Sequence, residues 1–204
     1  MAARLRSNLL ALAVLALLAE RPMHPYEMAT TMRERRKEES IKLNYGSLYS
    51  TVQSLDKRGL IAVKSTIRDG KRPERTIYAI TEAGKLELDD WMSELIATPA
   101  REYTSFEAGL SLLPVLEPDE AVRRLEERVA KLGEWLLMAQ AIHELAAKQG
   151  LPRLLVIESE YTVMQKTAEL EWTKSLIEEI RNGTLQGIAE WHEWHKPENS
   201  QRER

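Results

Sequence analysis

The period of the apolar residues changes abruptly at Gly59, and this change constrains the fold more than any other feature. Before it, Leu48, Val52 and Leu55 recur at steps of four and three, the spacing of one helix face. After it, "LIAVKSTI" alternates in the manner of a strand, and one face is made by Ile61, Val63, Ser65 and Ile67. We therefore predict a helix from about Asn44 or Gly46 that ends at Gly59, whose permissive backbone suits a helix C-terminus, and then a strand.

Two more helices are predicted before this one, and a second strand after it. The apolar run from Leu9 to Ala19, with Ser7 as candidate N-cap, predicts one helix, and "PYEMATTM" predicts another. "RTIYAI" at 75–80 is rich in β-forming residues, and "DG" in the preceding "RDGKRPE" marks a turn. Three helices followed by a hairpin are the order of a winged helix-turn-helix, whose third helix enters the DNA major groove.

The start of the chain has a second interpretation. Basic residues followed by the Leu9–Ala19 run resemble a signal peptide. The run is too short to span a bilayer, and no convincing A-x-A cleavage site precedes Glu20. We therefore keep the run in the fold as the first helix and expect no membrane segment.

The two parts of the chain carry opposite net charge. Residues 1–80 contain 15 Lys and Arg against 8 Asp and Glu, a net of +7, whereas residues 81–204 contain 14 against 24, a net of −10. The basic part is typical of a segment that meets a polyanion. The chain contains no cysteine, which excludes disulfides and thiolate metal sites and fits a reducing compartment, so we expect a cytoplasmic protein.

The rest of the chain is predicted to be helical. Thr81 is a candidate N-cap of a fourth helix, and "TPAREYTSFEAG" at 98–109 is a candidate linker, with the DNA-facing half ending near 98–101. The region beyond Pro118 carries an apolar seam with heptad spacing. This seam is the predicted dimer interface, and its candidates are Val122, Leu125, Val129, Leu132, Leu136 and His143. A last helix from about Leu154 to Arg181 is predicted to face inward with Ile157, Tyr161, Met164, Ala168, Trp172, Leu176 and Ile180.

The predicted fold class is therefore mainly α, in two domains. Residues 1–98 form a winged helix-turn-helix with a two-stranded β wing and a linking helix, residues 99–196 form a helical dimerisation domain, and 197–204 are a disordered tail. A dimer is expected because a helix-turn-helix reads twofold-symmetric operators best as a pair.

Three motifs together resemble the PadR family of bacterial winged-helix transcriptional regulators. They are "LLALAVLALLAERPMHPYEM", "YGSLYSTVQSLDKRGLI" and "RPERTIYAITEAG", in this order and spacing, and they cover about Leu9 to Trp91. The acidic helical part is similar, in composition, to the C-terminal region of members related to virulence activators. The resemblance implies DNA binding, dimerisation and, for most members, repression.

The resemblance also implies roles for individual residues. Gly46 to Tyr49 match the family's G-[ST]-L-Y start of the recognition helix, which would put Ser47 and Tyr49 close to DNA. Arg72, Pro73 and the strand from Arg75 match the family's wing. The sequence departs from the family pattern at Pro25, where Gly is usual, and at Ser50, where Pro is usual, so base preference does not carry over.

We predict DNA contacts from the third helix, from Tyr26 of the second helix and from the hairpin. Basic side chains of the hairpin would hold phosphates, and Ser50, Thr51 and Gln53 are the candidates for base edges, with the Gln amide suited to adenine. The alternative is an ordinary solvated helix face. The predicted DNA-contacting residues are Tyr26, Asn44, Ser47, Tyr49, Ser50, Thr51, Gln53, Lys57, Lys64, Arg68, Lys71, Arg72 and Arg75.

Some members of the family sense aromatic compounds, and this points to the tryptophans as candidates for an effector pocket. Trp91, Trp135 and Trp172 could line such a pocket for a small aromatic effector; the alternative, which we favour, is packing in the core and the dimer interface. His192 and His195 in "WHEWH" are spaced for one metal ion, but no third ligand is evident, so we expect no metal site and no cofactor.

Motifs of common enzymes are missing from the sequence, including G-x-S-x-G, G-x-x-x-x-G-K-[ST] and G-x-G-x-x-G. We therefore predict no enzymatic activity and a dimeric regulator, a repressor, that binds an inverted-repeat operator through residues 46–58 and the wing at 61–80. The rival hypothesis is a winged-helix module that binds protein and has no specific DNA target.

Overall fold

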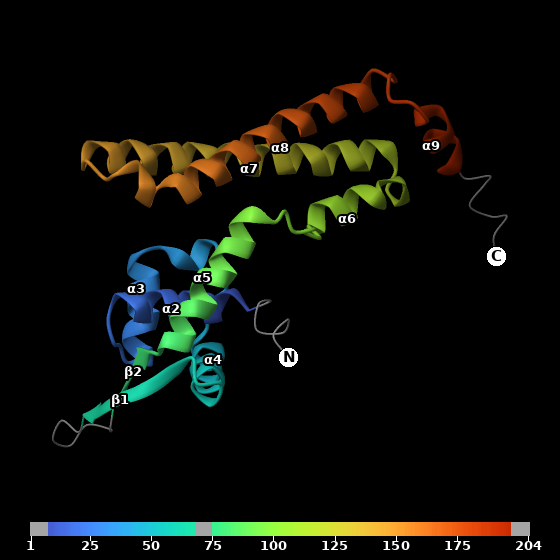
Figure 1. Cartoon of the computed structure of the whole chain (residues 1–204). Coiled ribbons are helices and arrows are strands. Elements are labelled where there is room, and N and C mark those ends of the chain that lie inside the picture. Colours follow the sequence, from blue (N-terminus) through green and yellow to red (C-terminus); the bar gives the residue numbers. More distant parts are fainter. Residues whose placement is uncertain (1–7, 68–74, 197–204) are drawn as a thin grey trace. The chain divides into compact units, whose positions relative to one another are not determined.

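The computed structural model describes residues 8–67 and 75–196, which divide into two compact units, Met1–Glu102 and Tyr103–Arg204 (Figure 1). The predicted tail at 197–204 lies outside the described residues. Each unit has a core of its own. Among the described residues, none of the helices combines the length and the apolar character that crossing a bilayer requires.

The N-terminal unit is a winged helix-turn-helix, as predicted. Its helices and strands, in chain order, are α2 (Leu9–Glu20), α3 (Pro25–Glu34), η1 (Lys37–Glu39), α4 (Tyr45–Lys57), β1 (Ile61–Ile67), β2 (Arg75–Ile80) and α5 (Glu82–Ala97). α2 is apolar nearly all round and forms the centre of the core, because other elements of the unit cover it. Trp91 of α5 closes this core and is 1% exposed.

Side-chain caps fix the starts of the helices. Asn8 caps α2, accepting from the backbone N of Leu10 at 3.2 Å, while the predicted cap Ser7 lies outside the described residues. Thr81 caps α5, as predicted. Gly59 has a φ of +71° after the end of α4, the left-handed conformation for which glycine is suited.

The hairpin departs from simple alternation. β1 pairs antiparallel with β2, and a bulge between Val63 and Ser65 shifts the register. Ile61 is buried, whereas Val63 is 51% exposed. Beyond the bulge Ser65 and Ile67 no longer continue the face of Val63, so the prediction of one continuous face is wrong. Met23 adds a bridge to Tyr78, through backbone hydrogen bonds of 3.1 and 3.0 Å, which ties the turn before α3 to the wing.

The C-terminal unit is entirely helical in its described part. Its elements are α6 (Ser105–Ser111), η2 (Leu113–Val115), α7 (Pro118–Lys148), η3 (Arg153–Leu155), α8 (Ile157–Arg181) and α9 (Ile188–Trp194). α7 and α8 lie side by side (Figure 1). The short helix α6, capped by Thr104, begins within the stretch 98–109 that was predicted to be a linker, and this corrects the prediction.

The predicted dimer seam on α7 packs against α8 of the same chain, and this corrects the prediction. Ala121 and Leu125 are buried with Ile177 and Ile180, and His143 Nε2 lies 2.6 Å from Ser159 Oγ. Of the six candidates, Val122, Leu125 and Leu132 are buried, and Val129, Leu136 and His143 are half-buried. These side chains pack against other helices of the same chain and leave little surface for contact with a second copy.

The predicted inward face of α8 is also wrong for most of its length. Thr173, Ile177 and Ile180 are the buried residues of this helix. The exposed ones include Ile157, Tyr161, Met164 and Trp172, each about half exposed. The burial follows a helix face rotated from the most apolar one, and Ser159 on this face contacts His143 of α7.

α9 folds back onto the segment before α7. Trp191 Nε1 donates to the Leu116 carbonyl at 2.8 Å, and His195 Nε2 lies 2.9 Å from the Pro114 carbonyl. His195 is thus engaged with the backbone. Within the described ranges, no group of three His, Cys, Asp or Glu side chains is arranged to hold a metal ion.

Candidate nucleic-acid interface

The N-terminus of α4 is held by a side-chain cap. Asn44 Oδ1 accepts a hydrogen bond from the backbone N of Ser47 at 2.7 Å, and Ser50 Oγ donates to the Ser47 carbonyl at 3.0 Å. Asn44, a predicted DNA contact, therefore has a structural task as well. The cap fixes where α4 begins and so which side chains face outward.

The outer face of α4 carries most of the residues predicted to contact DNA. Tyr49 is 43% exposed, and Ser50, Gln53 and Lys57 are exposed as well. Ser47 is half-buried. Such a face combines hydroxyl, amide and ammonium donors, which are the groups that contact base edges and phosphates.

Thr51 corrects the prediction, because its side chain points into the unit. It is 5% exposed, and its Oγ1 accepts a hydrogen bond from Asn8 Nδ2 at 3.2 Å. A buried hydroxyl that already has a hydrogen-bond partner within the unit is not available to a base edge. Thr51 therefore joins α4 to the start of α2.

A groove of about 750 Å³ lies where the N-terminal end of α3, the outer face of α4 and the strand β2 meet. It brings together four predicted DNA-contacting residues from three elements, namely Tyr26, Tyr49, Gln53 and Arg75. His24 and Tyr78 also line it. The groove thus joins the wing to the recognition helix in one concave surface.

Two titratable groups of this groove have a shifted pKa: burial raises the pKa of Tyr78, and the pKa of His24 is lowered. His24 Nδ1 accepts from the backbone N of Tyr26 at 3.1 Å, so it caps α3 through an unprotonated nitrogen. Burial lowers the pKa of His24, and the nearby charge of Arg75 lowers it further, while Glu27 acts in the opposite direction. The positive charge of Arg75 therefore acts on a group at the start of α3.

Sequence reasoning missed an aromatic pair at the edge of this surface. The rings of Tyr26 and Tyr45 stack with centroids 6.2 Å apart and planes 14° apart. Arg33 Nη1 donates to the Tyr45 hydroxyl at 2.6 Å, and Arg33 Cζ lies 4.6 Å from the Tyr45 ring centroid. The sequence feature that could have indicated this cluster is the spacing of Tyr26 and Arg33. Arg33 lies two helical turns after Tyr26 on α3, so both side chains are on the same side of the helix.

The wing contributes exposed basic residues at its base. Lys64 on β1 and Arg75 at the start of β2 are both exposed. Arg68, Lys71 and Arg72, which were predicted to hold phosphates, lie outside the described residues.

Comparisons with known proteins agree with this geometry. Residues 14–90 match the model of the Transcriptional regulator PadR-like family. "Negative transcriptional regulator PadR" of Bacillus subtilis (strain 168) is 25% identical over 126 residues, which are 60% of this chain and 68% of the relative. The winged-helix segment of this chain, residues 14–90, is thus similar to PadR-like transcriptional regulators.

Solved PadR-family structures share the fold beyond the matched segment. Bacillus subtilis PadR in complex with operator DNA has a TM-score of 0.67 at 20% identity, covering 84% of this chain and 97% of that one. The same protein in complex with p-coumaric acid has a TM-score of 0.69 at 18% identity, covering 84% and 98%. The Vibrio cholerae virulence activator AphA has a TM-score of 0.63 at 18% identity, covering 85% and 98%.

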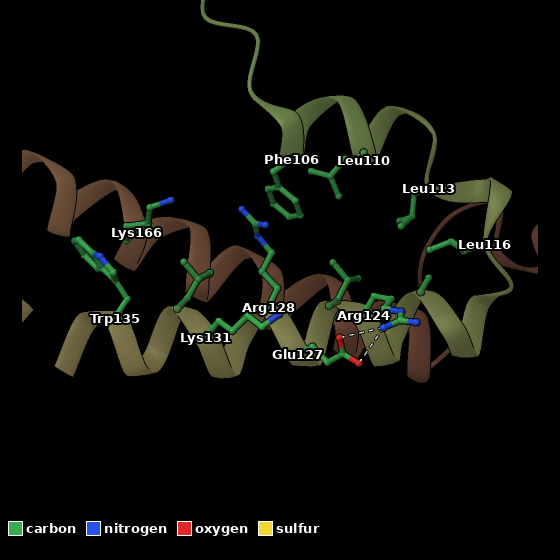
Figure 2. A pocket seen from close by; sticks show the side chains of 14 residues that line it. Phe106, Leu110, Leu113, Leu116, Arg124, Glu127, Arg128, Lys131, Trp135 and Lys166 are labelled. Atoms are coloured by element: carbon green, nitrogen blue, oxygen red, sulfur yellow. Dashed lines mark hydrogen bonds and ion pairs between the residues drawn. The ribbon is translucent and has the colours of Figure 1, made fainter. Parts of the chain in front are cut away.

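The three tryptophans proposed for a pocket in this PadR-like chain do not share one. Trp91 is buried in the core of the N-terminal unit, which corresponds to the favoured of the two interpretations and leaves it no surface for a ligand. Trp135 lines a cavity of the C-terminal unit (Figure 2). Trp172 is 49% exposed, and its ring meets the Phe106 ring edge-on at 6.3 Å.

Proposed function

We propose that this PadR-like regulator binds an inverted-repeat DNA operator as a homodimer, with α4 in the major groove and the wing on the phosphate backbone. The observation that carries this proposal is the groove that joins Tyr49 and Gln53 of α4 to Arg75 of the wing and Tyr26 of α3. It places a base-reading amide beside a phosphate-binding guanidinium, the two kinds of contact that a specific DNA interface combines.

The relatives support this proposal and its direction of regulation. The Bacillus subtilis relative is a negative regulator by name and has been solved with operator DNA. We therefore propose repression, with no enzymatic activity and with action in the cytoplasm, where such a regulator meets DNA. The structure of that relative with p-coumaric acid supports a response to a small effector as well.

A homodimer is supported by apolar side chains that the single chain leaves exposed. On α7, Met138, Ile142 and Leu145 form a stripe at steps of four and three. On α8, Ile157, Tyr161 and Met164 form a second stripe with the same spacing. Exposed apolar stripes of this kind are typical of surfaces that a partner covers, and a twofold-symmetric partner suits an inverted repeat.

The test separates DNA binding from the rival function, a module that binds protein. Arg75→Ala is compared with Lys85→Ala, which removes an exposed charge that pairs with Glu82 on α5. Binding to a random-sequence duplex is measured by fluorescence anisotropy at several salt concentrations. We expect Arg75→Ala to weaken binding and to make the salt slope shallower by about one, while Lys85→Ala leaves both unchanged. No salt-dependent binding by the unaltered protein would favour the protein-binding module.

A further inference from the structure

The outer face of α4 continues beyond the groove, to the first residue of the helix. Tyr45 begins α4, and Tyr49 and Gln53 follow it at steps of four, so the three side chains share one side of the helix. Tyr49 and Gln53 line the groove, whereas Tyr45 lies outside it and is 39% exposed. The face that meets DNA in the proposed function therefore extends to Tyr45.

Two contacts fix the side chain of Tyr45. Its ring stacks on the ring of Tyr26, which lines the groove. Its hydroxyl accepts a hydrogen bond of 2.6 Å from Arg33 Nη1, at the end of α3. A side chain that is already held in one position loses less conformational freedom when it binds a partner. The Tyr45 hydroxyl is thus pre-organised on the outer face.

Arg33 and Tyr45 together present hydrogen-bond donors. A tyrosine hydroxyl that accepts from a guanidinium keeps its own proton for another acceptor, and the two bonds polarise one another. Within residues 8–67 and 75–196, no group of the protein accepts that proton. Because a guanidinium also only donates, the pair suits a phosphate oxygen, which only accepts, better than a base edge that combines donors and acceptors.

The charge of Arg33 is only loosely neutralised by the protein. Arg33 Nε lies 3.7 Å from Glu38 Oε2, which is beyond hydrogen-bond distance, and the two side chains are 41% and 52% exposed. Arg35, two residues later, donates to both oxygens of the Glu20 carboxylate, at 2.5 and 2.8 Å. Arg33 therefore retains charge for an external anion, whereas Arg35 has its carboxylate on α2.

We propose that Arg33 and Tyr45 bind one phosphate of the DNA backbone, and that Tyr26 positions the Tyr45 ring for this contact. The inference rests on the proposed DNA binding and adds a second phosphate contact to that of the wing. The Arg33 guanidinium and the Tyr45 hydroxyl both donate to the phosphate oxygens. Because Tyr45 is the first residue of α4, this contact sets the position of the helix in the major groove without reading sequence itself.

The first experiment removes the charge of Arg33 and measures binding of the full chain to a random-sequence duplex by fluorescence anisotropy at several salt concentrations. We expect Arg33→Gln to weaken binding about tenfold and to make the salt slope shallower by about one. Arg35→Gln removes the same charge from the same segment and should leave the slope unchanged. Equal changes in the two slopes would overturn the proposal, since only the total charge would then matter.

Urea denaturation of Arg33→Gln separates this contact from a structural link between α3 and α4. A structural link would lower the stability of the fold and leave the salt slope of DNA binding unchanged, and that result would also overturn the proposal.

The second experiment removes the hydroxyl and keeps the ring. Tyr45→Phe retains the stack on Tyr26, so we expect DNA binding about fivefold weaker with an unchanged salt slope, because no charge is lost. The double variant with Arg33→Gln should be weakened by less than the product of the two single effects, because both groups hold the same phosphate. Tyr161→Phe is the control, since that hydroxyl also accepts from a side chain, Gln165, but lies on α8. DNA affinity of Tyr45→Phe equal to that of the unaltered chain would overturn the contact.

Arg75→Ala in the same assay separates failure of this inference from failure of the proposed function. If the unaltered chain binds with a salt dependence that Arg75→Ala reduces, while Arg33→Gln and Tyr45→Phe bind like the unaltered chain, the second phosphate contact is overturned and the DNA interface stands. An absence of salt-dependent binding by the unaltered chain would overturn both.

Discussion

Ser50 and Thr51 show how far residue-level reasoning reaches on α4. Both carry a hydroxyl, and both were predicted to face DNA, yet Ser50 is exposed and Thr51 is buried. The difference arises from position on the helix, because Thr51 lies three residues after Leu48 and four before Leu55, on the buried side. There its Oγ1 accepts a hydrogen bond from Asn8, 43 residues earlier. Residue type predicts which groups can bind a partner, whereas position on the helix decides which of them face outward.

Thr51→Val tests whether the Thr51 hydroxyl is buried and bonded to Asn8, because it removes only that hydroxyl. It keeps the shape of the side chain and removes the acceptor for Asn8 Nδ2, so we expect a loss of about 1 kcal/mol in the free energy of unfolding. DNA affinity should stay the same. Urea denaturation and anisotropy measure the two quantities, and Ser50→Ala serves as the exposed counterpart. A large loss of DNA affinity in a stable Thr51→Val variant would contradict the burial of this residue.

The protonation of His24 makes the stability of the fold depend on pH, and this dependence can be measured. Its pKa lies below the ordinary value because burial and Arg75 both disfavour the protonated form. The fold therefore gains stability from neutral His24 above about pH 6.5, the unfolded value, and loses it as the pH falls through the lower folded pKa. His24→Asn keeps an N-cap and should flatten this dependence in thermal melts.

The same residue reports on the wing. We expect Arg75→Ala to raise the pKa of His24, measured by NMR titration of the His24 ring protons, because a like charge is removed. Lys85→Ala is the matched control. A pKa of His24 that does not move in Arg75→Ala would mean that the base of the wing is not beside α3.

At the scale of elements, periodicity predicted the helices better than it predicted their partners. The seam on α7 is buried as its spacing requires, but against α8 of the same chain. On α8, the most apolar positions are largely exposed, whereas Thr173 is buried and donates to the Glu169 carbonyl at 2.7 Å. A repeat of apolar residues indicates that some surface covers a face, and it carries no information on which chain supplies that surface.

The contact between α5 and the end of α4 is testable through Gly84, which belongs to the "ITEAG" motif. A Cβ at Gly84 would lie 2.0 Å from the Leu60 carbonyl oxygen and 2.8 Å from Ile80 Cγ1. We expect Gly84→Ala to destabilise the N-terminal unit by about 1–3 kcal/mol, despite the better helix propensity of alanine.

The control for this change is Gly133→Ala on α7, where a Cβ has no atom within 4 Å. That substitution should stabilise α7 by up to about 1 kcal/mol. Thermal melts followed by circular dichroism compare the two. Equal effects of the two substitutions would show that α5 does not approach Leu60 this closely.

The two exposed stripes make a prediction about assembly. Ile142 is 40% exposed in the single chain, and we expect Ile142→Lys to convert a dimer into a monomer by placing a charge in the interface. Gln140→Lys adds the same charge on the opposite side of α7, next to Glu144, and should remain dimeric. Sedimentation equilibrium distinguishes these outcomes, and a dimeric Ile142→Lys would contradict a role of this stripe.

At the scale of the whole molecule, the order of elements was the most predictable property. The change of period at Gly59, the "DG" turn and three linked motifs were enough for a winged helix-turn-helix in the first half of the chain. The helices α6 and α9 were missed, because each has only seven residues, too few for a periodic pattern to emerge. The groove was not predictable either, since it depends on how α3, α4 and β2 meet in space.

The measurement that tests the proposed function most directly is a selection of bound duplexes from a random-sequence DNA library by the purified protein. We expect an enriched inverted repeat whose half-site centres lie about one helical turn of DNA, or a multiple of it, apart. With Gln53→Ala, the preference at one position in each half-site should relax, at a cost of about 1–3 kcal/mol in specific binding. A library without an enriched sequence after selection would contradict sequence-specific DNA binding by α4 and the wing.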